Sequence, residues 1–328
     1  MDNRLVFQKQ PNVFTAIAAG FKTLGEHLYL LSFPLVLDIF LLYAPRYTVS
    51  TLVSSFLAQF NPLAEATSEL QQLWTEISAS LNTFFQSYSV SSALRSYPLG
   101  VPSLLSSQVF MENPFGPLPE IALNSEGKAL AFLLLFGVIG AVLGAVNFNV
   151  CSLPTFKEAK KQDTKALLKV IANLVLLPLL FWALLLAVLI PVSLIVSVLS
   201  LLHPFLGLLA YFFTAMVLIS VFLPALFAPH AVLVLNLNVW QSIRASIRLI
   251  RPYYSATSLF VILAVLTSYL TNLLWQTAGA DSRMVFVGIF GHALVSSALL
   301  IASFHYFIRV LELTQEHELA QETPESSL

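Results

Sequence analysis

The fold class is decided between residues 170 and 228, where the chain reads VIANLVLLPLLFWALLLAVLIPVSLIVSVLSLLHPFLGLLAYFFTAMVLISVFLPALFA without one charged residue. A membrane-spanning helix needs about 20 mainly apolar residues. This stretch is too long for one span, and His203-Pro204 divides it into two, at 170–202 and 204–228. Proline suits the first turn of the second helix, because the N–H that it lacks would be unpaired there. Three other prolines predict kinks rather than breaks inside these spans: Pro178, Pro191 and Pro224.

The rest of the chain continues this pattern. Of its 328 residues, 57% are hydrophobic and 10% are charged, whereas a soluble domain carries about 25% charged residues. We therefore predict an all-α, polytopic membrane protein with about six transmembrane helices and with membrane lipids as its surroundings. The net charge of −1 gives no basic surface for nucleic acid, and the single Cys151 excludes an internal disulfide. The other four predicted spans are residues 28–45, 129–150, 256–276 and 284–308.

The lysines and arginines between these helices predict the orientation. With a cytoplasmic N-terminus, twelve of the 16 lie in cytoplasmic segments and four lie outside. This distribution follows the positive-inside rule, and the opposite orientation would violate it. We expect both termini in the cytoplasm. The compact hydrophobic composition is typical of a prokaryotic cell membrane.

Residues 46–128 form the one sizeable segment predicted outside the cell. Apolar residues recur there at three- and four-residue steps, which predicts a small helical cap with a break at Asn61-Pro62. After Tyr97 the segment becomes rich in proline and glycine, which predicts an extended strap that returns to the membrane. Its charges are mostly acidic. A protein partner, if there is one, would bind at this cap.

Residues 1–27 and 309–328 are the predicted cytoplasmic ends. The first contains an amphipathic helix that begins after Asn12, a predicted N-cap, and lies at the membrane surface. The second is an acidic tail that we expect to be disordered beyond the first turn after Thr314. The predicted apolar side of the N-terminal helix consists of Phe14, Ile17, Phe21, Leu24 and Leu28.

Two basic cytoplasmic segments lie at 151–169 and 229–255. The second contains a helix with its arginines on one face, which are Arg244, Arg248 and Arg251. A basic amphipathic helix of this kind lies along an anionic leaflet, so we expect the three arginines to contact lipid headgroups. Its predicted apolar face consists of Val239, Ile243, Ile247 and Ile250.

Asp38 is the one carboxylate well inside a predicted span. Ionisable residues in a membrane are costly and suggest function. His292 in the last span lies at a similar depth, so the two could form an ion or proton pair. The alternative is a buried structural hydrogen bond of Asp38, or a protonated carboxyl facing serine or threonine.

Small residues mark one face of the span at 129–150. Gly137, Gly140 and Gly144 include a G-x-x-x-G pattern, which lets two helices approach closely within the chain or between chains. The histidines have no metal-ligand spacing, and the chain lacks the nucleophile-elbow, phosphate-loop and dinucleotide motifs. We therefore expect no catalytic residues, no cofactor and no metal site.

The stretch ALFAPHAVLVLNLNVWQSIRASIRLIRPYY at Ala225–Tyr254 resembles the membrane-domain family found fused to glycerophosphodiester phosphodiesterases. In that family a span ends at proline, a short amphipathic helix follows, and the next span begins. The matching residues here are Pro224 or Pro229, Ala245, Arg248 and Pro252. The resemblance covers the C-terminal half, without a hydrolase domain. It implies a membrane domain and no catalytic residues.

Three functions fit these observations. The first is a non-catalytic scaffold, accessory subunit or assembly factor. The second is a small-solute or ion transporter that uses Asp38 and His292, with kinked helices lining the path. The third is a membrane enzyme acting on lipid, which would need a cluster of acids, bases or metal ligands that the sequence does not contain.

Overall fold

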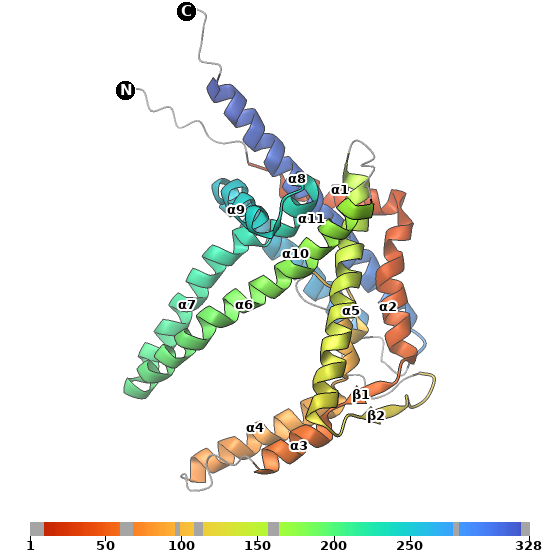
Figure 1. The fold of residues 1–328 in the computed structure, drawn as a ribbon, viewed down its shortest axis with the longest axis vertical. Helices are drawn as coiled ribbons and strands as arrows, with labels where there is room; N and C mark the ends of the chain where they lie inside the picture. Colours follow the sequence, from red (N-terminus) through yellow and green to blue (C-terminus); the bar gives the residue numbers. More distant parts are fainter. Residues whose placement is uncertain are drawn as a thin grey trace, which may run out of the picture. The chain divides into compact units, whose positions relative to one another are not determined.

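The computed structural model describes residues 10–59, 68–95, 99–107, 114–156, 164–277 and 282–322 (Figure 1). Within these ranges the regular structure is helical apart from one pair of short strands, which confirms an all-α protein. Its elements are α1 Val13–Glu26, η1 Leu28–Leu31, α2 Ser32–Tyr43, β1 Arg46–Thr48, α3 Ser50–Gln59, α4 Ser68–Ser87, η2 Val90–Arg95, η3 Leu105–Ser107, β2 Glu120–Ala122, α5 Glu126–Ser152, η4 Leu153–Thr155, α6 Thr164–Leu202, α7 Pro204–Ala225, α8 Ala228–Leu235, α9 Val239–Ile250, η5 Arg251–Tyr253, α10 Tyr254–Gln276 and α11 Val285–Glu322.

Several of these helices are long and apolar enough to cross a membrane, so the chain is a polytopic membrane protein. The predicted first span at 28–45 is the weakest, since α2 has 12 residues and rises only about 18 Å of the ~30 Å that a bilayer core requires. The described residues provide a sixth stretch long enough to cross a membrane only if α1 and α2 are counted together. The other five stretches are Glu126–Thr155, Thr164–Leu202, Pro204–Leu235, Val239–Trp275 and Val285–Leu319.

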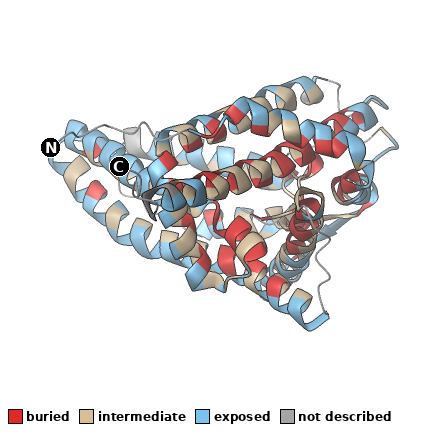
Figure 2. Ribbon diagram, turned by 90° about the horizontal axis from the view of Figure 1, so that it is seen from above, coloured by how far each residue is buried: buried red, intermediate tan, exposed pale blue. Residues whose placement is uncertain are grey.

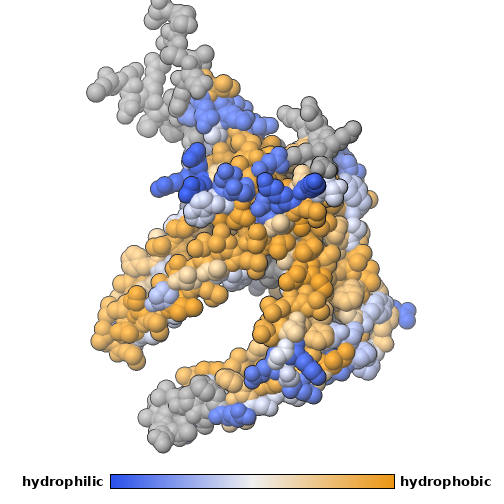
Figure 3. All heavy atoms as spheres, viewed as in Figure 1, coloured by the Kyte–Doolittle hydropathy of each residue, from blue (hydrophilic) through white to orange (hydrophobic). Residues whose placement is uncertain are grey.

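Helices α6 and α7 form an antiparallel pair joined at His203-Pro204 (Figure 1). The predicted break is confirmed: α6 ends at Leu202, and the His203 side chain accepts a hydrogen bond of 3.2 Å from the N–H of Phe205. The internal prolines leave both helices unbroken. Only 6% of the apolar stretch of each helix is buried, and Figure 3 shows their surface as almost entirely hydrophobic. Most of this surface is therefore available to lipid.

The last helix differs from its prediction. α11 continues to Glu322, so the expectation of a disordered tail after Thr314 is wrong for the part of the tail that the structure describes. The extension is rich in glutamate, glutamine, leucine and alanine, which favour helix. Arg309 also donates hydrogen bonds to Glu312 at 2.9 Å and Glu316 at 3.4 Å along one side of the helix.

The chain forms two compact units, which are described separately. One unit contains residues 1–27, 149–267 and 298–328, and the other contains 28–148 and 268–297. Figure 2 shows that buried positions are concentrated on some helices and sparse on others. The first unit has an aromatic core in which Phe260 stacks on Tyr306 at 4.6 Å between ring centroids. The Tyr306 hydroxyl shares a hydrogen bond of 2.9 Å with Thr257.

Helix α1 packs in the first unit with a face that overlaps the predicted one only in part. Asn12 is its N-cap, as expected, and accepts a hydrogen bond from the N–H of Thr15. Phe14 on the predicted apolar side is 68% exposed, whereas the small residues of another side are buried. A Cβ atom at Gly20 would lie 2.7 Å from the Cβ of Ala302, so glycine permits this close contact with α11. Leu24 of the predicted apolar side is buried, whereas Phe14 and Phe21 remain outside, where lipid can cover them.

In the second unit the predicted cap consists of the α3–α4 helix pair, with its ends held by a strand pair. Strands β1 and β2 pair in parallel, with Arg46 opposite Glu120. The Asn82 side chain of α4 accepts a hydrogen bond of 2.9 Å from Ser54 of α3. The strand pair was not predicted, because three-residue strands show no measurable alternation. The predicted break at Asn61-Pro62 lies outside the described residues.

Candidate functional site

Helix α9 carries the three arginines that were predicted to bind headgroups, and its N-terminus is fixed by a capping interaction. Asn238 accepts a hydrogen bond from the N–H of Gln241, and the Gln241 side chain accepts one from the N–H of Asn238. This reciprocal capping box satisfies two N–H groups at the start of the helix. Asn236 ends the preceding helix α8 with a left-handed φ of 54°, a conformation that asparagine tolerates well.

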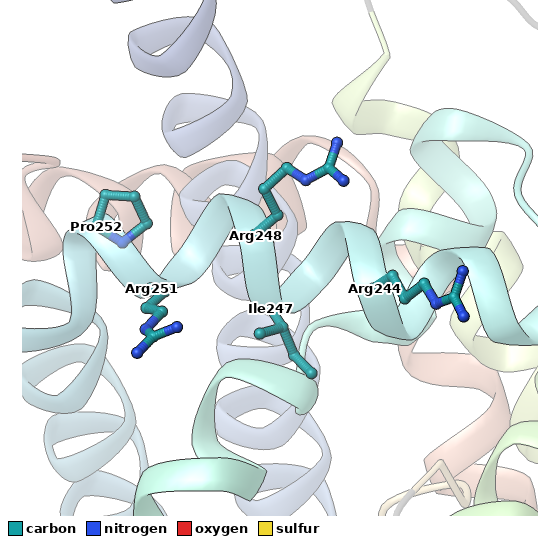
Figure 4. Close-up of a pocket in the computed structure, with 5 residues that line it drawn as sticks. All are labelled: Arg244, Ile247, Arg248, Arg251 and Pro252. Atoms are coloured by element: carbon teal, nitrogen blue, oxygen red, sulfur yellow. The ribbon is translucent and has the colours of Figure 1, made fainter.

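The three arginines line an open cavity of about 550 Å³ along α9, together with Ile247 and Pro252. In Figure 4 their guanidinium groups spread along the helix, with that of Arg248 above the helix and that of Arg251 below it in this view. They therefore present separate positive charges along a surface rather than one enclosed anion site. Arg244 also lies over the ring of Trp240, at 4.9 Å from the centroid.

The charges of these arginines are not neutralised within the described part of the chain, where no carboxylate lies within ion-pair distance of any of them. All three side chains are exposed. An exposed guanidinium group binds phosphate oxygens through two parallel hydrogen bonds, which makes arginine a common phosphate ligand. The α9 surface can therefore bind phosphate-bearing molecules by charge and hydrogen bonding.

The inner face of α9 is more polar than predicted. Ser242, Ser246 and Ile250 are buried, whereas Ile243 and Ile247 of the predicted apolar face are only half-buried. Ser246 donates a buried hydrogen bond of 2.5 Å to the carbonyl oxygen of Pro224. That carbonyl belongs to the last turn of α7, where helices leave backbone acceptors unpaired. Serine thus attaches α9 to α7 by a specific bond that an apolar side chain could not make.

Asp38 lies fully buried in α2 and accepts three hydrogen bonds from one short segment. The donors are the Ser103 hydroxyl at 2.5 Å and the N–H groups of Leu104 and Leu105 at 3.0 Å each. Non-helical backbone at membrane depth must have its polar groups satisfied inside the protein. The carboxylate therefore holds the start of η3 in place, which matches the structural alternative weighed for it.

His292 does not complete a pair with Asp38. No ion pair joins them among the residues that the structure describes, and the buried Nε2 of His292 has no hydrogen-bond partner. Trp275 packs nearby: a Cβ atom added at Gly291 would lie 2.6 Å from its ring. The Nε1 of Trp275 is also buried and without a partner.

The glycines of α5 have different environments. A side chain at Gly144 would overlap the backbone of Leu99 and Gly100, whereas one at Gly137 would meet no atom within 4 Å. Gly140 is buried. The close approach at Gly144 involves the proline-rich strap rather than a second helix. The strap was predicted as an extended segment, and its residues Val101, Ser103 and Leu104 are almost completely buried.

Sequence patterns did not identify Ser103 or Ser246 as important residues. Ser103 bonds to a group 65 positions away and Ser246 to one 22 positions away, and no local sequence pattern indicates such distant partners. No protein family, curated protein or solved structure matches the chain. The resemblance of Ala225–Tyr254 to the phosphodiesterase-associated membrane domain stays a prediction.

Proposed function

We propose that the chain is a non-catalytic scaffold or accessory protein of a cell membrane, with its α9 surface on the cytoplasmic leaflet. The observation that carries this proposal is the set of exposed arginines on α9, whose charges no described carboxylate neutralises. The cytoplasmic leaflet is anionic, and each arginine near it contributes about 1 kcal/mol of attraction. The positive-inside distribution supports the same orientation, with both termini in the cytoplasm.

The surroundings of Asp38 support a structural role over transport. A transported ion or proton must reach its binding group and leave it again, whereas the two oxygens of Asp38 are occupied by three donors of the chain itself. Occupied in this way, the carboxylate positions the strap. The occupied oxygens of Asp38 therefore favour the scaffold proposal over the transporter alternative.

The test uses the purified full chain and measures its thermal stability in detergent with added phosphatidylglycerol or phosphatidylcholine. We expect the anionic lipid to stabilise the wild type more than the zwitterionic one. The triple variant Arg244→Gln, Arg248→Gln, Arg251→Gln should lose this preference. Arg283→Gln, which changes an exposed arginine elsewhere, should retain it. An unchanged preference in the triple variant would refute the headgroup contact.

A small-solute transporter remains the second candidate because of His292 and Trp275. Two buried nitrogen atoms without partners in one unit could bind water or a polar solute. The deciding measurement is the stability of Asp38→Asn, His292→Gln and the double variant. Additive losses favour the scaffold, and a coupling of more than about 0.5 kcal/mol favours a shared site.

The stability loss of Asp38→Asn should itself be substantial. An amide can keep one oxygen acceptor, but its NH₂ group would then face an N–H donor of Leu104 or Leu105. Hydrogen bonds to charged groups are worth about 1.5–3 kcal/mol, so we expect a loss in that range.

A further inference from the structure

Helix α4 leaves a row of large apolar side chains exposed. Leu73, Ile77, Leu81 and Phe84 recur at three- and four-residue steps, so they share one side of the helix. They are between 37% and 50% exposed. The side next to α3 is different: the half-buried Asn82 lies there and accepts the hydrogen bond from Ser54 of α3. The apolar row, which we call the α4 stripe, therefore lies beside the α3 contact rather than in it.

The other exposed side of α4 is polar and contains no cation. It carries Gln72, Thr75, Glu76 and Thr83, and no lysine or arginine occurs between Arg46 and Arg95. An anionic leaflet would not attract such a helix, in contrast to α9. A zwitterionic leaflet attracts amphipathic helices through their apolar side alone.

The base of the α3–α4 pair lies at the end of a membrane-spanning helix of the same unit. Residue 48 of β1 pairs with residue 122 of β2, four residues before α5 begins at Glu126. The Thr51 hydroxyl at the start of α3 donates a hydrogen bond of 3.2 Å to Asn124. The helix pair is thereby held where the apolar part of α5 begins.

The direction of α4 relative to α5 indicates how the α3–α4 pair lies in the membrane. Figure 1 shows α4 running across the axis of α5 rather than along it. Figure 3, in the same view, shows hydrophobic atoms along the edge of α4 that faces back along α5. Because α4 lies at the end of the membrane-spanning α5 and runs across the axis of α5, it would lie in the plane of the membrane. Its hydrophobic edge would then face the hydrocarbon.

We propose that the α3–α4 pair lies in the interfacial region of a zwitterionic leaflet, with the α4 stripe in contact with acyl chains. Trp74 and Tyr88 are near this boundary, where aromatic residues are common. The stripe is then covered by lipid and not by a second protein. This places a second membrane contact in the segment between α2 and α5, independent of the arginines on α9.

The test compares spin labels on two sides of α4 in the full chain. Ile77→Cys reports on the stripe, and Ala79→Cys reports on the polar side about 200° around the helix. Both are made with Cys151→Ala and reconstituted in phosphatidylcholine nanodiscs. Power saturation measures the access of oxygen, which dissolves in lipid, and of a water-soluble nickel complex.

We expect the label at residue 77 to be accessible to oxygen and shielded from nickel, and the label at residue 79 to show the opposite pattern. Equal nickel access at both positions would overturn the proposal, because the stripe would then be in water. Shielding of residue 77 from both reagents would also overturn it, because protein would then cover the stripe. Leu81→Cys with Thr83→Cys is a second matched pair, should Ile77→Cys fail to fold.

Discussion

Helices α4 and α9 are both amphipathic, yet they use their two sides in opposite ways. α9 buries Ser242 and Ser246 against its own unit and exposes three arginines. α4 exposes a row of apolar side chains together with a polar side that lacks cations. An apolar side in the sequence of an amphipathic helix therefore does not predict whether protein or lipid covers that side. The charge on the opposite side is informative about the leaflet that each helix would meet.

The largest expected effect concerns labelling, because α4 and α9 should be labelled from opposite sides of the membrane. Cysteine in place of Ala79 on α4 should react with an impermeant maleimide on intact cells, and cysteine in place of Arg248 on α9 should react only after permeabilisation. The difference should be all-or-none, because a bilayer excludes the reagent. Cys151 is fully buried and should not contribute. Labelling of both helices from the same side would remove the contrast between them.

The second effect concerns salt. The attraction of α9 to an anionic leaflet should be at most about 3 kcal/mol for three arginines and should weaken as the screening length falls from about 10 Å at 0.1 M to about 3 Å at 1 M salt. The phosphatidylglycerol preference of the detergent-purified chain should therefore disappear at high salt. The oxygen access of a label at residue 77 on α4 should not change, since apolar burial is not screened. A salt-dependent α4 signal would show that charge also holds this helix.

The third effect tests how α4 is anchored. Arg46 donates hydrogen bonds to the carbonyl oxygens of Gln86 at 3.2 Å and Ser87 at 2.9 Å, at the end of α4, and to Glu120 at 3.1 Å. A cation at this end also interacts favourably with the helix dipole. Arg46→Gln should lower the free energy of unfolding by about 2–3 kcal/mol. Arg283→Gln is the matched control and should have little effect, and chemical denaturation in detergent measures both.

The smallest effect tests how α9 is anchored. Ser246→Ala leaves the buried carbonyl oxygen of Pro224 without its donor, which should cost about 1–2 kcal/mol. Ser255→Ala, at an exposed position on α10, should cost close to zero. Thermal denaturation of the two variants provides the comparison. Equal stability of Ser246→Ala and the wild type would mean that α9 is held by its half-buried isoleucines instead.

Features set by neighbouring residues were predictable from the sequence, and features set by distant residues were not. The break at His203-Pro204 and the N-cap at Asn12 depend on local backbone chemistry, and both occur where expected. The buried face of α1 could be predicted only in part, since Leu24 is buried as expected but Phe14 is not. Hydrophobicity favours Phe14, but only Gly20 allows the backbone of α11 to come close, and lipid covers phenylalanine as well as protein does.

The candidate site shows the same limit. Periodicity placed the three arginines on the exposed side of α9 without any tertiary information, because charge alone keeps them out of the apolar interior. The partners of Asp38 were not predictable, since Ser103, Leu104 and Leu105 carry no signal that distinguishes them from the rest of the strap. The same holds for the anchor of α4, which depends on Arg46 reaching carbonyl groups 40 and 41 residues away.

The bond between Asp38 and the strap has a consequence for how the protein is made. During synthesis the carboxylate of α2 leaves the ribosome 65 residues before Ser103, its hydroxyl partner. An aspartate at the centre of a helix costs about 2.5–3.5 kcal/mol on insertion, and α2 is short. We therefore expect α2 to insert stably only after the strap has been translated. A nascent chain arrested before residue 103 should leave α2 accessible to extraction by alkali, and one arrested well beyond α5 should not.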